Sequence, residues 1–297
     1  MSYVVAPQKQ QTMNNRFAYF GTPYVSRDTL AILHERGYTP AVVITSPARP
    51  RGRGMQLTPS ETEVWANEHS IPVLTPEKID DAAIREIASY GCEYAVVVAY
   101  GKILPETLIT LFPKGVLNIH YSLLPKYRGA SPVEAALLHG DTITGVAIQK
   151  MVYQLDAGDV VAMQEVAIEP TETTKELRPR LVSIGTELLA NVLPAYLEGS
   201  ITPTPQDHAL ATKCGKIRKE DGELTLSADA ITNWNTYRAY AESPGTYFFV
   251  ERDGTRARVK IKSAAFHNGQ FIPQLVVLEG KPVQEYSVLL AAGWRAI

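Results

Sequence analysis

Short apolar runs alternate with amphipathic stretches over the first two thirds of the chain. Residues 94–99 read YAVVVA, a continuous apolar run between turn signals that is typical of a strand covered on both faces. Further strand candidates are residues 16–20, 41–45, 71–74 and 116–119. Helical periodicity fills the intervals, beginning at residue 24 and recurring over residues 60–69, 80–90, 102–111, 131–139 and 174–197. This alternation predicts an α/β fold, a doubly wound, mainly parallel Rossmann-like sheet with its ligands at the carboxyl ends of the strands.

The last third of the chain has a different pattern. Residues 198–206 are rich in Gly, Pro and Thr and show no periodicity, so we expect a linker between a domain at 16–197 and a smaller domain at 207–297. After a helical stretch at 228–241, β-prone runs recur at residues 245–251, 256–263, 274–278 and 286–289. These runs predict a small C-terminal β-barrel of the OB-like kind. The first fifteen residues are mostly polar, and we expect a loose leader at 1–15.

Composition narrows the class of protein. The chain has 297 residues, of which 45% are hydrophobic and 20% charged, and its net charge of −2 does not by itself indicate a nucleic-acid binder. No apolar run reaches the roughly 18 residues of a membrane span, and the beginning of the chain lacks a signal-peptide pattern, so we expect a cytoplasmic protein without membrane contact. Cys92 and Cys214 are too few and too isolated for a disulfide framework or a zinc site, and no metal is expected. The chain lacks G-x-G-x-x-G, which disfavours an NAD-dependent enzyme.

Three polar residues lie where buried strands give way to loops. Asn118 and His120 are separated by one residue, so a strand at 116–119 places them on the same face. Asp156 lies in a loop between two β-rich runs at 145–152 and 160–168. A histidine can hold or deliver a proton, a carboxylate can orient it and accept protons, and an amide can donate to a developing oxyanion. The three residues together suit acyl or formyl transfer to an amine.

Several longer motifs occur in the order that they have in one enzyme family. They are FGTP (20–23), PARPRGRGMQLTP (47–59), VVVAYGKILP (96–105), NIHYSLLPKYRGASP (118–132) and LDAGD (155–159). From Arg16 onwards the chain resembles the formyltransferases that use 10-formyltetrahydrofolate. The resemblance implies that Asn118, His120 and Asp156 are the catalytic trio and that 10-formyltetrahydrofolate is the co-substrate. It also implies a folate-contacting loop of Ser122, Leu123, Leu124 and Pro125, and a pterin pocket lined by Val96, Val97, Val98, Ala99 and Tyr100. Tyr121 departs from the family, which usually has Gly there, and this change affects the backbone freedom expected beside His120.

Basic residues bear on the acceptor substrate. Arg49, Arg51 and Arg53 lie in a Gly/Pro-rich loop after the second strand, where they could clamp the phosphates of an RNA end or form ordinary solvated charge. Two more basic clusters follow residue 207, namely Lys213, Lys216, Arg218 and Lys219, and then Arg256, Arg258, Lys260 and Lys262. The second cluster alternates along one strand, so its side chains share a face that is either a solvated edge or an RNA-binding surface.

The resemblance favours the RNA interpretation. It implies that the acceptor is the α-amine of methionine on initiator tRNA, for translation initiation. The loop of Arg49, Arg51 and Arg53 and the C-terminal domain would then bind the tRNA, with Arg53 the foremost candidate, and we expect a monomer. A sugar-nucleotide N-formyltransferase with the same trio and donor is the alternative, against which the arginine loop and the basic barrel count. A non-catalytic RNA-binding protein on a decayed enzyme scaffold is a third hypothesis, which the retained trio argues against.

Overall fold

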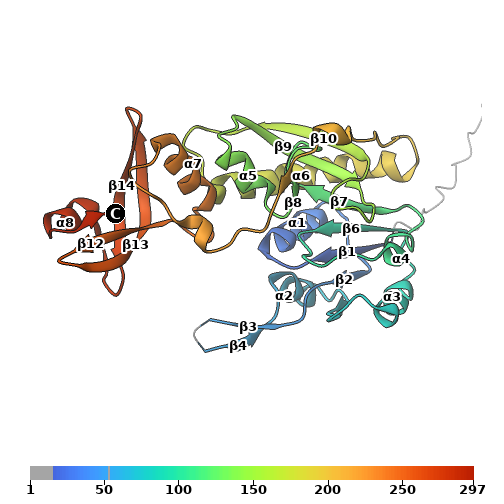
Figure 1. The fold of residues 1–297 in the computed structure, drawn as a ribbon. Helices are drawn as coiled ribbons and strands as arrows, with labels where there is room; N and C mark the ends of the chain where they lie inside the picture. The colour runs from blue at the N-terminus through green and yellow to red at the C-terminus, as the bar shows by residue number, and fades with distance from the viewer. Residues whose placement is uncertain (1–15, 53) are drawn as a thin grey trace, which may run out of the picture. The chain divides into compact units, whose positions relative to one another are not determined.

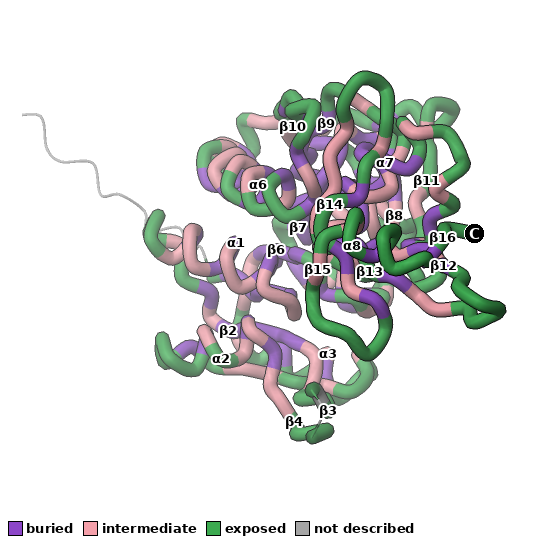
Figure 2. Tube along the Cα trace, turned by 90° about the vertical axis from the view of Figure 1, so that its left-hand side faces the viewer, coloured by how far each residue is buried: buried purple, intermediate pink, exposed green. Residues whose placement is uncertain are grey.

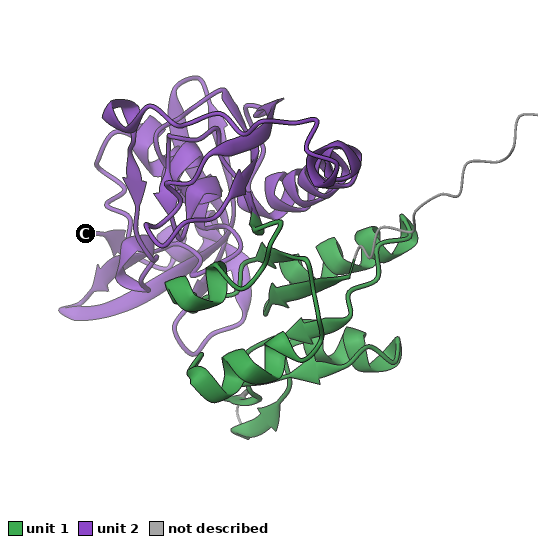
Figure 3. Cartoon of the chain, turned by 90° about the vertical axis from the view of Figure 1, so that its right-hand side faces the viewer, with its two compact units in different colours: residues 1–117 green, residues 118–297 purple. Residues whose placement is uncertain are grey.

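The computed structural model describes residues 16–52 and 54–297, so the leader expected at 1–15 lies outside the described residues (Figure 1). The chain divides into two compact units, residues 1–117 and 118–297, which Figure 3 shows in different colours. This division lies well before the linker that the sequence predicts at 198–206. Figure 2 shows the buried stretches, which follow the strands, and the exposed turns between the C-terminal strands.

Unit 1 consists of parallel strands with helices between them. Its elements are β1 (Phe17–Gly21), α1 (Tyr24–Glu35), β2 (Val42–Ile44), β3 (Arg49–Arg51), β4 (Gln56–Thr58), α2 (Glu61–Glu68), β5 (Val73–Leu74), α3 (Asp81–Ala88), β6 (Tyr94–Val98) and α4 (Glu106–Ile109). Parallel pairing joins β6 to β1, β1 to β2 and β2 to β5. Both β1 and β6 are buried along their whole length, as the apolar runs predict for strands covered on both faces.

Local residues account for where the helices of unit 1 begin. The side chain of Ser60 accepts a hydrogen bond from the backbone N–H of Glu63 at the start of α2, and Asp80 caps α3 in the same way. The helix expected at 102–111 is shorter, because Pro105 keeps the residue before it extended and α4 begins only at Glu106.

The arginine-rich segment is a β-hairpin, where the sequence predicted a flexible loop. Strand β3 pairs antiparallel with β4, and Arg49 lies opposite Thr58 in this pairing. The described residues at the end of the hairpin include Met55, which is exposed and has a positive φ of 49°. The regular pairing gives the arginine-bearing strand a defined backbone.

Unit 2 contains the end of the main sheet and a second, antiparallel sheet. Its elements are β7 (Val116–His120, whose first two residues belong to unit 1), β8 (Arg128–Gly129), α5 (Pro132–Leu138), β9 (Ile143–Lys150), β10 (Val160–Ala167), α6 (Thr174–Leu197), the 3-10 turn η1 (His208–Leu210), β11 (Lys213–Cys214), η2 (Glu220–Gly222), α7 (Ala230–Tyr240), β12 (Tyr247–Arg252), β13 (Thr255–His267), β14 (Gln270–Leu278), β15 (Val283–Glu285), α8 (Tyr286–Ala291) and β16 (Arg295–Ala296).

The main sheet has seven strands in the order β10-β9-β7-β6-β1-β2-β5. Strands β9 and β10 form an antiparallel pair at one end of it. The fold class is therefore the mainly parallel α/β sheet that the alternating pattern predicts. Gly185 lets helix α6 approach this sheet closely, because a Cβ atom there would lie 2.8 Å from Val146 and 2.9 Å from Ile119.

The C-terminal sheet has five antiparallel strands in the order β15-β14-β13-β12-β16. One of its faces packs around a core that includes Phe248, Val259, Val276 and Leu289. Its edge strands β15 and β16 do not pair with each other in the described sheet, so the expected barrel is an open one. The strand predicted at 286–289 is wrong: these residues lie in helix α8, because so short an apolar run fits either periodicity.

Residues 204–214, which we call the strap, return from helix α6 to the middle of unit 2. Thr204 exchanges two backbone hydrogen bonds of 2.8 Å with Val160. Further along, β11 pairs in parallel with β8. The end of the segment that the sequence predicts as a linker is thus bonded to the body of unit 2.

Candidate functional site

Asn118 and His120 project from the end of strand β7. The residue between them, Ile119, lies against Gly185 of helix α6, so the two polar side chains share the opposite face of the strand. Both are buried, with 9% and 5% of their surface exposed. The side-chain amide of Asn118 has no hydrogen-bond partner among the described residues, which leaves its N–H donors available.

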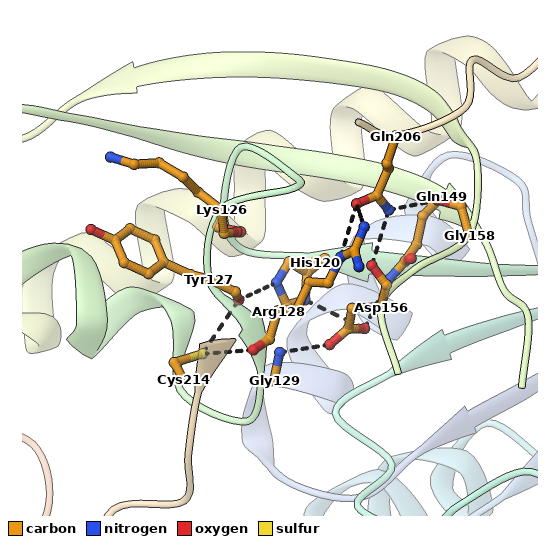
Figure 4. A network of polar contacts seen from close by, with 11 residues as sticks. His120, Lys126, Tyr127, Arg128, Gly129, Gln149, Asp156, Gly158, Gln206 and Cys214 are labelled. Atoms are coloured by element: carbon orange, nitrogen blue, oxygen red, sulfur yellow. Dashed lines mark hydrogen bonds and ion pairs between the residues drawn. The ribbon is translucent and has the colours of Figure 1, made fainter. Parts of the chain in front are cut away.

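The imidazole of His120 lies between a carbonyl and a carboxylate (Figure 4). Its Nε2 is 2.9 Å from the backbone oxygen of Tyr127. Because a carbonyl oxygen only accepts hydrogen bonds, Nε2 carries the proton in this contact. Its Nδ1 faces Oδ1 of Asp156 at 3.8 Å. Nδ1 is therefore the nitrogen that is left for exchange with a reactant.

Tyr127 is held through each of its polar groups. Its backbone N–H donates to Oγ1 of Thr212, and its phenol donates to Asp141 at 2.7 Å. Burial, and then this bond to Asp141, raise the pKa of the phenol, which remains a donor at neutral pH. Its positive φ of 58° turns its carbonyl into the contact with His120. A left-handed residue with this many partners fixes which nitrogen of His120 is protonated.

Asp156 lies in the loop between β9 and β10 and also has a left-handed backbone, with φ 48°. Its Oδ2 accepts a hydrogen bond of 2.8 Å from the backbone N–H of Gly129. Its Oδ1, the atom nearest His120, accepts another of 2.8 Å from the side chain of Gln149. The carboxylate is thus oriented by donors from two different segments. All three members of the trio that the sequence predicts lie in unit 2: Asp156 faces His120, and Asn118 shares the face of β7 that carries His120.

The strap adds a set of polar contacts that sequence reasoning missed (Figure 4). Gln206 accepts hydrogen bonds from two guanidinium nitrogens of Arg128, at 3.1 and 2.7 Å. Its amide nitrogen donates to the backbone oxygens of Asp156 and Gly158, at 2.9 and 2.6 Å. Gln149 was also missed. No sequence pattern marks either glutamine, since the hydrogen bonds that give each its role form only when the chain folds.

The residues expected to contact folate fall into two groups, each described within its own unit. In unit 2, the hydroxyl of Ser122 is buried and donates to the backbone oxygen of Lys126, and Leu124 packs with Ala147 and Val160. Leu123 and Pro125 are partly exposed. Ser122 and Leu124 therefore shape the loop from inside, and Leu123 and Pro125 are its accessible side chains.

In unit 1, Val96, Val97 and Val98 are buried within β6, and the chain turns at its end. Ala99 is exposed there and has a φ of 48°. The hydroxyl of Tyr100 is buried and has no hydrogen-bond partner among residues 16–52 and 54–297, and burial raises its pKa. Of the arginines, Arg49 is exposed on β3, and Arg53 lies outside the described residues.

Tyr121 does not require the freedom of a glycine. It is buried, and it is absent from the described residues that have a positive φ. The strained position of this loop is instead Tyr127, six residues later. The departure from the family pattern at Tyr121 thus leaves the backbone beside His120 in an ordinary conformation.

The residues that the structure describes contain no group of three or more His, Cys, Asp or Glu placed to hold a metal ion. Within the same residues, none of the helices has the length and apolar character that crossing a bilayer requires.

Comparison with known proteins places the chain in a family. A model of the formyl transferase family matches residues 15–193, more than half of the chain. The chain belongs to the formyl transferase family. Within it, the chain is 38% identical to a methionyl-tRNA formyltransferase of Chloroflexus aurantiacus over 88% of its own length and 84% of the relative's. It is 39% identical to the methionyl-tRNA formyltransferase of Thermotoga maritima over 79% and 75% of the two chains. The protein is thus a formyl-transferring enzyme of the methionyl-tRNA formyltransferase branch.

Solved structures share the fold. A methionyl-tRNA formyltransferase from Clostridium thermocellum superimposes with a TM-score of 0.58 at 16% identity, covering 90% of this chain and 99% of that one. An N-formyltransferase from Helicobacter canadensis, in complex with folinic acid and dTDP-3-aminofucose, gives 0.64 at 15% identity over 85% and 88%. At such identities the likeness concerns the fold, which therefore does not distinguish tRNA from sugar acceptors.

Proposed function

We propose that this protein transfers a formyl group from 10-formyltetrahydrofolate to the α-amine of methionine carried by initiator tRNA. The observation that carries the proposal is the buried arrangement of Asn118, His120 and Asp156 in a chain of this branch. Formyl transfer to an amine develops negative charge on the formyl oxygen and releases one proton from the amine. A site for this reaction needs a donor for the oxygen and an acceptor for the proton.

The chain's own residues supply both. Asn118 offers side-chain N–H groups that have no other partner among the described residues, so they can donate to the oxyanion. His120 has Nε2 bonded to Tyr127 and turns Nδ1 towards Asp156. With a proton on Nδ1, His120 is a second donor to the oxyanion, and the carboxylate of Asp156 stabilises the resulting imidazolium. Asp156 can accept the proton of the amine directly or through water.

The residues proposed for the folate fit a flat ring with a polar edge. Val96, Val97 and Val98 supply apolar surface, the exposed turn at Ala99 presents backbone groups, and the hydroxyl of Tyr100 needs a partner. In unit 2, Leu123 and Pro125 are the accessible side chains of the second proposed segment. The folate would supply the activated formyl group, and these residues would hold and orient it.

One face of the C-terminal sheet supports an RNA acceptor. Its outward residues include one acid, Glu251, opposite Arg256, and six basic or aromatic residues, which we call the basic–aromatic face: Tyr247, Phe249, Arg256, Arg258, Lys260 and Lys262. The guanidinium of Arg256 lies 4.0 Å from the centre of the Phe249 ring, and that of Arg258 lies 5.5 Å from Tyr247. Positive charges that follow a phosphate backbone, combined with rings on which bases stack, are typical of surfaces that bind single-stranded RNA.

The hairpin of β3 and β4 supports the same acceptor. Arg49 is exposed on it, and Met55 and Leu57 expose large apolar side chains, at 68% and 71% of their surface. We propose that Arg49, Arg51 and Arg53 contact tRNA phosphates, with Arg53 as the foremost candidate.

The test is a direct comparison of acceptors. Purified protein and 10-formyltetrahydrofolate are mixed with charged initiator tRNA, and in a parallel reaction with a dTDP-amino sugar, and the formylated products are quantified by mass spectrometry. We expect kcat/KM for the tRNA to exceed that for the sugar by several orders of magnitude. A higher kcat/KM for the sugar would replace the proposal with the sugar-nucleotide alternative. No folate-dependent product in either reaction would contradict the catalytic assignment.

A further inference from the structure

Gln206 belongs to the strap, outside the strands and loops that carry the proposed catalytic trio, yet only 7% of its surface is exposed. Its amide orientation follows from its partners. The guanidinium of Arg128 can only donate, so Oε1 faces it, and the carbonyls of Asp156 and Gly158 can only accept, so Nε2 faces them. One side chain thus joins two loops of the site through four hydrogen bonds (Figure 4).

We infer that Gln206 is a positioning residue that holds the loop of Asp156 against the loop of Arg128 and thereby sets the placement of the Asp156 carboxylate beside His120. The inference rests on the proposed function for its kinetic consequence. Its structural part, the restraint on residues 156–158, does not depend on which acceptor the enzyme uses.

The loop needs such a restraint. Asp156 has a left-handed backbone, which is uncommon for L-residues although Asp adopts it more readily than most. Gly158 packs so closely against Lys150 that a Cβ atom would lie 1.8 Å from the carbonyl oxygen of Lys150. Gln149 and Gly129 orient the carboxylate, whereas the backbone carbonyls of Asp156 and Gly158 accept from Gln206, the one side chain of the described residues that bonds to both.

The second loop is coupled to the same side chain. Arg128 is 6% exposed and directs Nε and Nη2 to Gln206, while Nη2 also donates to Nδ1 of His208 at 3.0 Å. The residue after Arg128 is Gly129, whose backbone N–H donates to Oδ2 of Asp156. Holding Arg128 therefore also places the donor that orients the carboxylate. The strap thus holds Asp156 in two ways: Gln206 bonds directly to its backbone carbonyl, and Arg128 positions the N–H of Gly129 that bonds to its carboxylate.

Only an amide satisfies both sets of partners. A carboxylate at position 206 would still accept from Arg128, but its second oxygen would face the two carbonyls at distances of 2.9 and 2.6 Å, where oxygens repel. A methionine would fill similar space and leave Arg128 and both carbonyls without that partner. Gln206→Glu therefore removes the restraint on the Asp156 loop selectively, and Gln206→Met removes both halves of the coupling.

The experiment compares Gln206→Glu and Gln206→Met with a matched control, Gln164→Glu, which makes the same chemical change at an exposed position of β10. Two quantities are measured for the full-length chains. The first is kcat and KM for the folate donor and for charged initiator tRNA. The second is amide hydrogen exchange of peptides that cover residues 156–159, with peptides of helix α6 as an internal reference.

We expect Gln206→Glu to lower kcat by roughly tenfold to a hundredfold, the scale of a misplacement of about 1 Å, with both KM values changed by less than about threefold. Exchange should rise at 156–159 and stay unchanged in α6. Gln206→Met should have the same direction of effect and serves as the test if the glutamate variant does not fold. Gln164→Glu should behave as the unmodified protein.

Two results would overturn the inference. One is kcat within twofold of the unmodified protein together with unchanged exchange at 156–159. The other is faster exchange throughout unit 2 with kcat and both KM values altered together, which would make Gln206 a general stability residue. Absence of formylation by the unmodified protein would refute the proposed function alone, because the exchange measurement still tests the restraint.

Discussion

Gly129 and Cys214 approach so closely that a Cβ atom on Gly129 would lie 2.0 Å from the carbonyl oxygen of Cys214. Gly129 also has a φ of 127°, which L side chains rarely adopt. This contact is where β8 meets the strap, and it brings the N–H of Gly129 to Asp156. The absence of a side chain at position 129 is therefore a requirement of the site.

Gly129→Ala should separate β8 from β11, because the backbone oxygen of Cys214 cannot yield as a flexible side chain would. We expect lower thermal stability, by several degrees, and loss of most activity. Gly215→Ala is the matched control: a Cβ atom there meets nothing within 4 Å, and its φ is ordinary. Differential scanning calorimetry of both variants checks the prediction, which fails if they unfold at similar temperatures.

Asp156→Asn should lower kcat by about two orders of magnitude, because the uncharged amide can neither accept the amine's proton nor stabilise the imidazolium of His120. Donor affinity should change much less. Asp159→Asn, an exposed residue three positions later, is the control and should retain activity. The same assay with Asn118→Ala should show a loss of similar size. Near-normal turnover in either variant would remove that residue from the proposed mechanism.

Replacing Arg49, Arg51 and Arg53 together with Gln should raise the KM for tRNA and leave that for the folate nearly unchanged. Each phosphate contact that is lost should reduce the slope of log affinity against log salt by roughly 0.7 to 0.9. The control neutralises two exposed basic residues elsewhere in unit 1, Lys78 and Arg85. If the salt dependence of tRNA binding is the same in both variants, the hairpin arginines are solvated charge.

The basic–aromatic face yields a separate prediction. Arg256→Gln with Arg258→Gln should weaken tRNA binding, because it removes two charges that lie over aromatic rings. Phe249→Leu should also weaken binding but leave the salt slope unchanged, since stacking does not release counterions. Fluorescence titrations at several salt concentrations distinguish the two effects. Unchanged tRNA affinity in all these variants would show that this face is ordinary solvated surface and does not bind tRNA.

The stability of the fold should depend on pH through Cys92. Burial raises the pKa of its thiol to about 11, an effect that Arg16 partly offsets. The folded chain therefore holds this proton more tightly than the unfolded chain. The associated stability is fully present below about pH 9 and is lost as the pH rises through about 11. Chemical unfolding of the unmodified protein and Cys92→Ala at pH 8 and 10.5 checks this: the variant should lose less stability, and equal losses would contradict the prediction.

The parts of the fold that local pattern determines were predictable. The first five residues of the run YAVVVA form β6, and the periodic stretch at 174–197 is α6 with the same bounds. Asn118 and His120 could be placed together because the side chains of a strand alternate. The error at α8 and the shorter α4 arose where a run was too short or a proline intervened.

The contacts that complete the site could not be predicted in this way. Gln206 lies in a stretch without periodicity, and its partner Arg128 is distant in sequence. The same holds for Thr212, which accepts from the backbone of Tyr127. Such long-range contacts depend on the tertiary arrangement of the loops. The local sequence around each residue contains no pattern that predicts them.

The strap has a consequence for any exchange of parts between this enzyme and its relatives. A chimera joined within 198–206, where composition suggests a boundary, would combine the strap of one protein with the loops of another. The loops of Arg128 and Asp156 would then contact the other protein's residues at positions 206, 212 and 214. Small differences in the length of the strap would shift the catalytic loops. A junction after Cys214 keeps each strap with the loops that it holds. The modular unit that can be moved between these proteins therefore begins later than the composition of the chain implies.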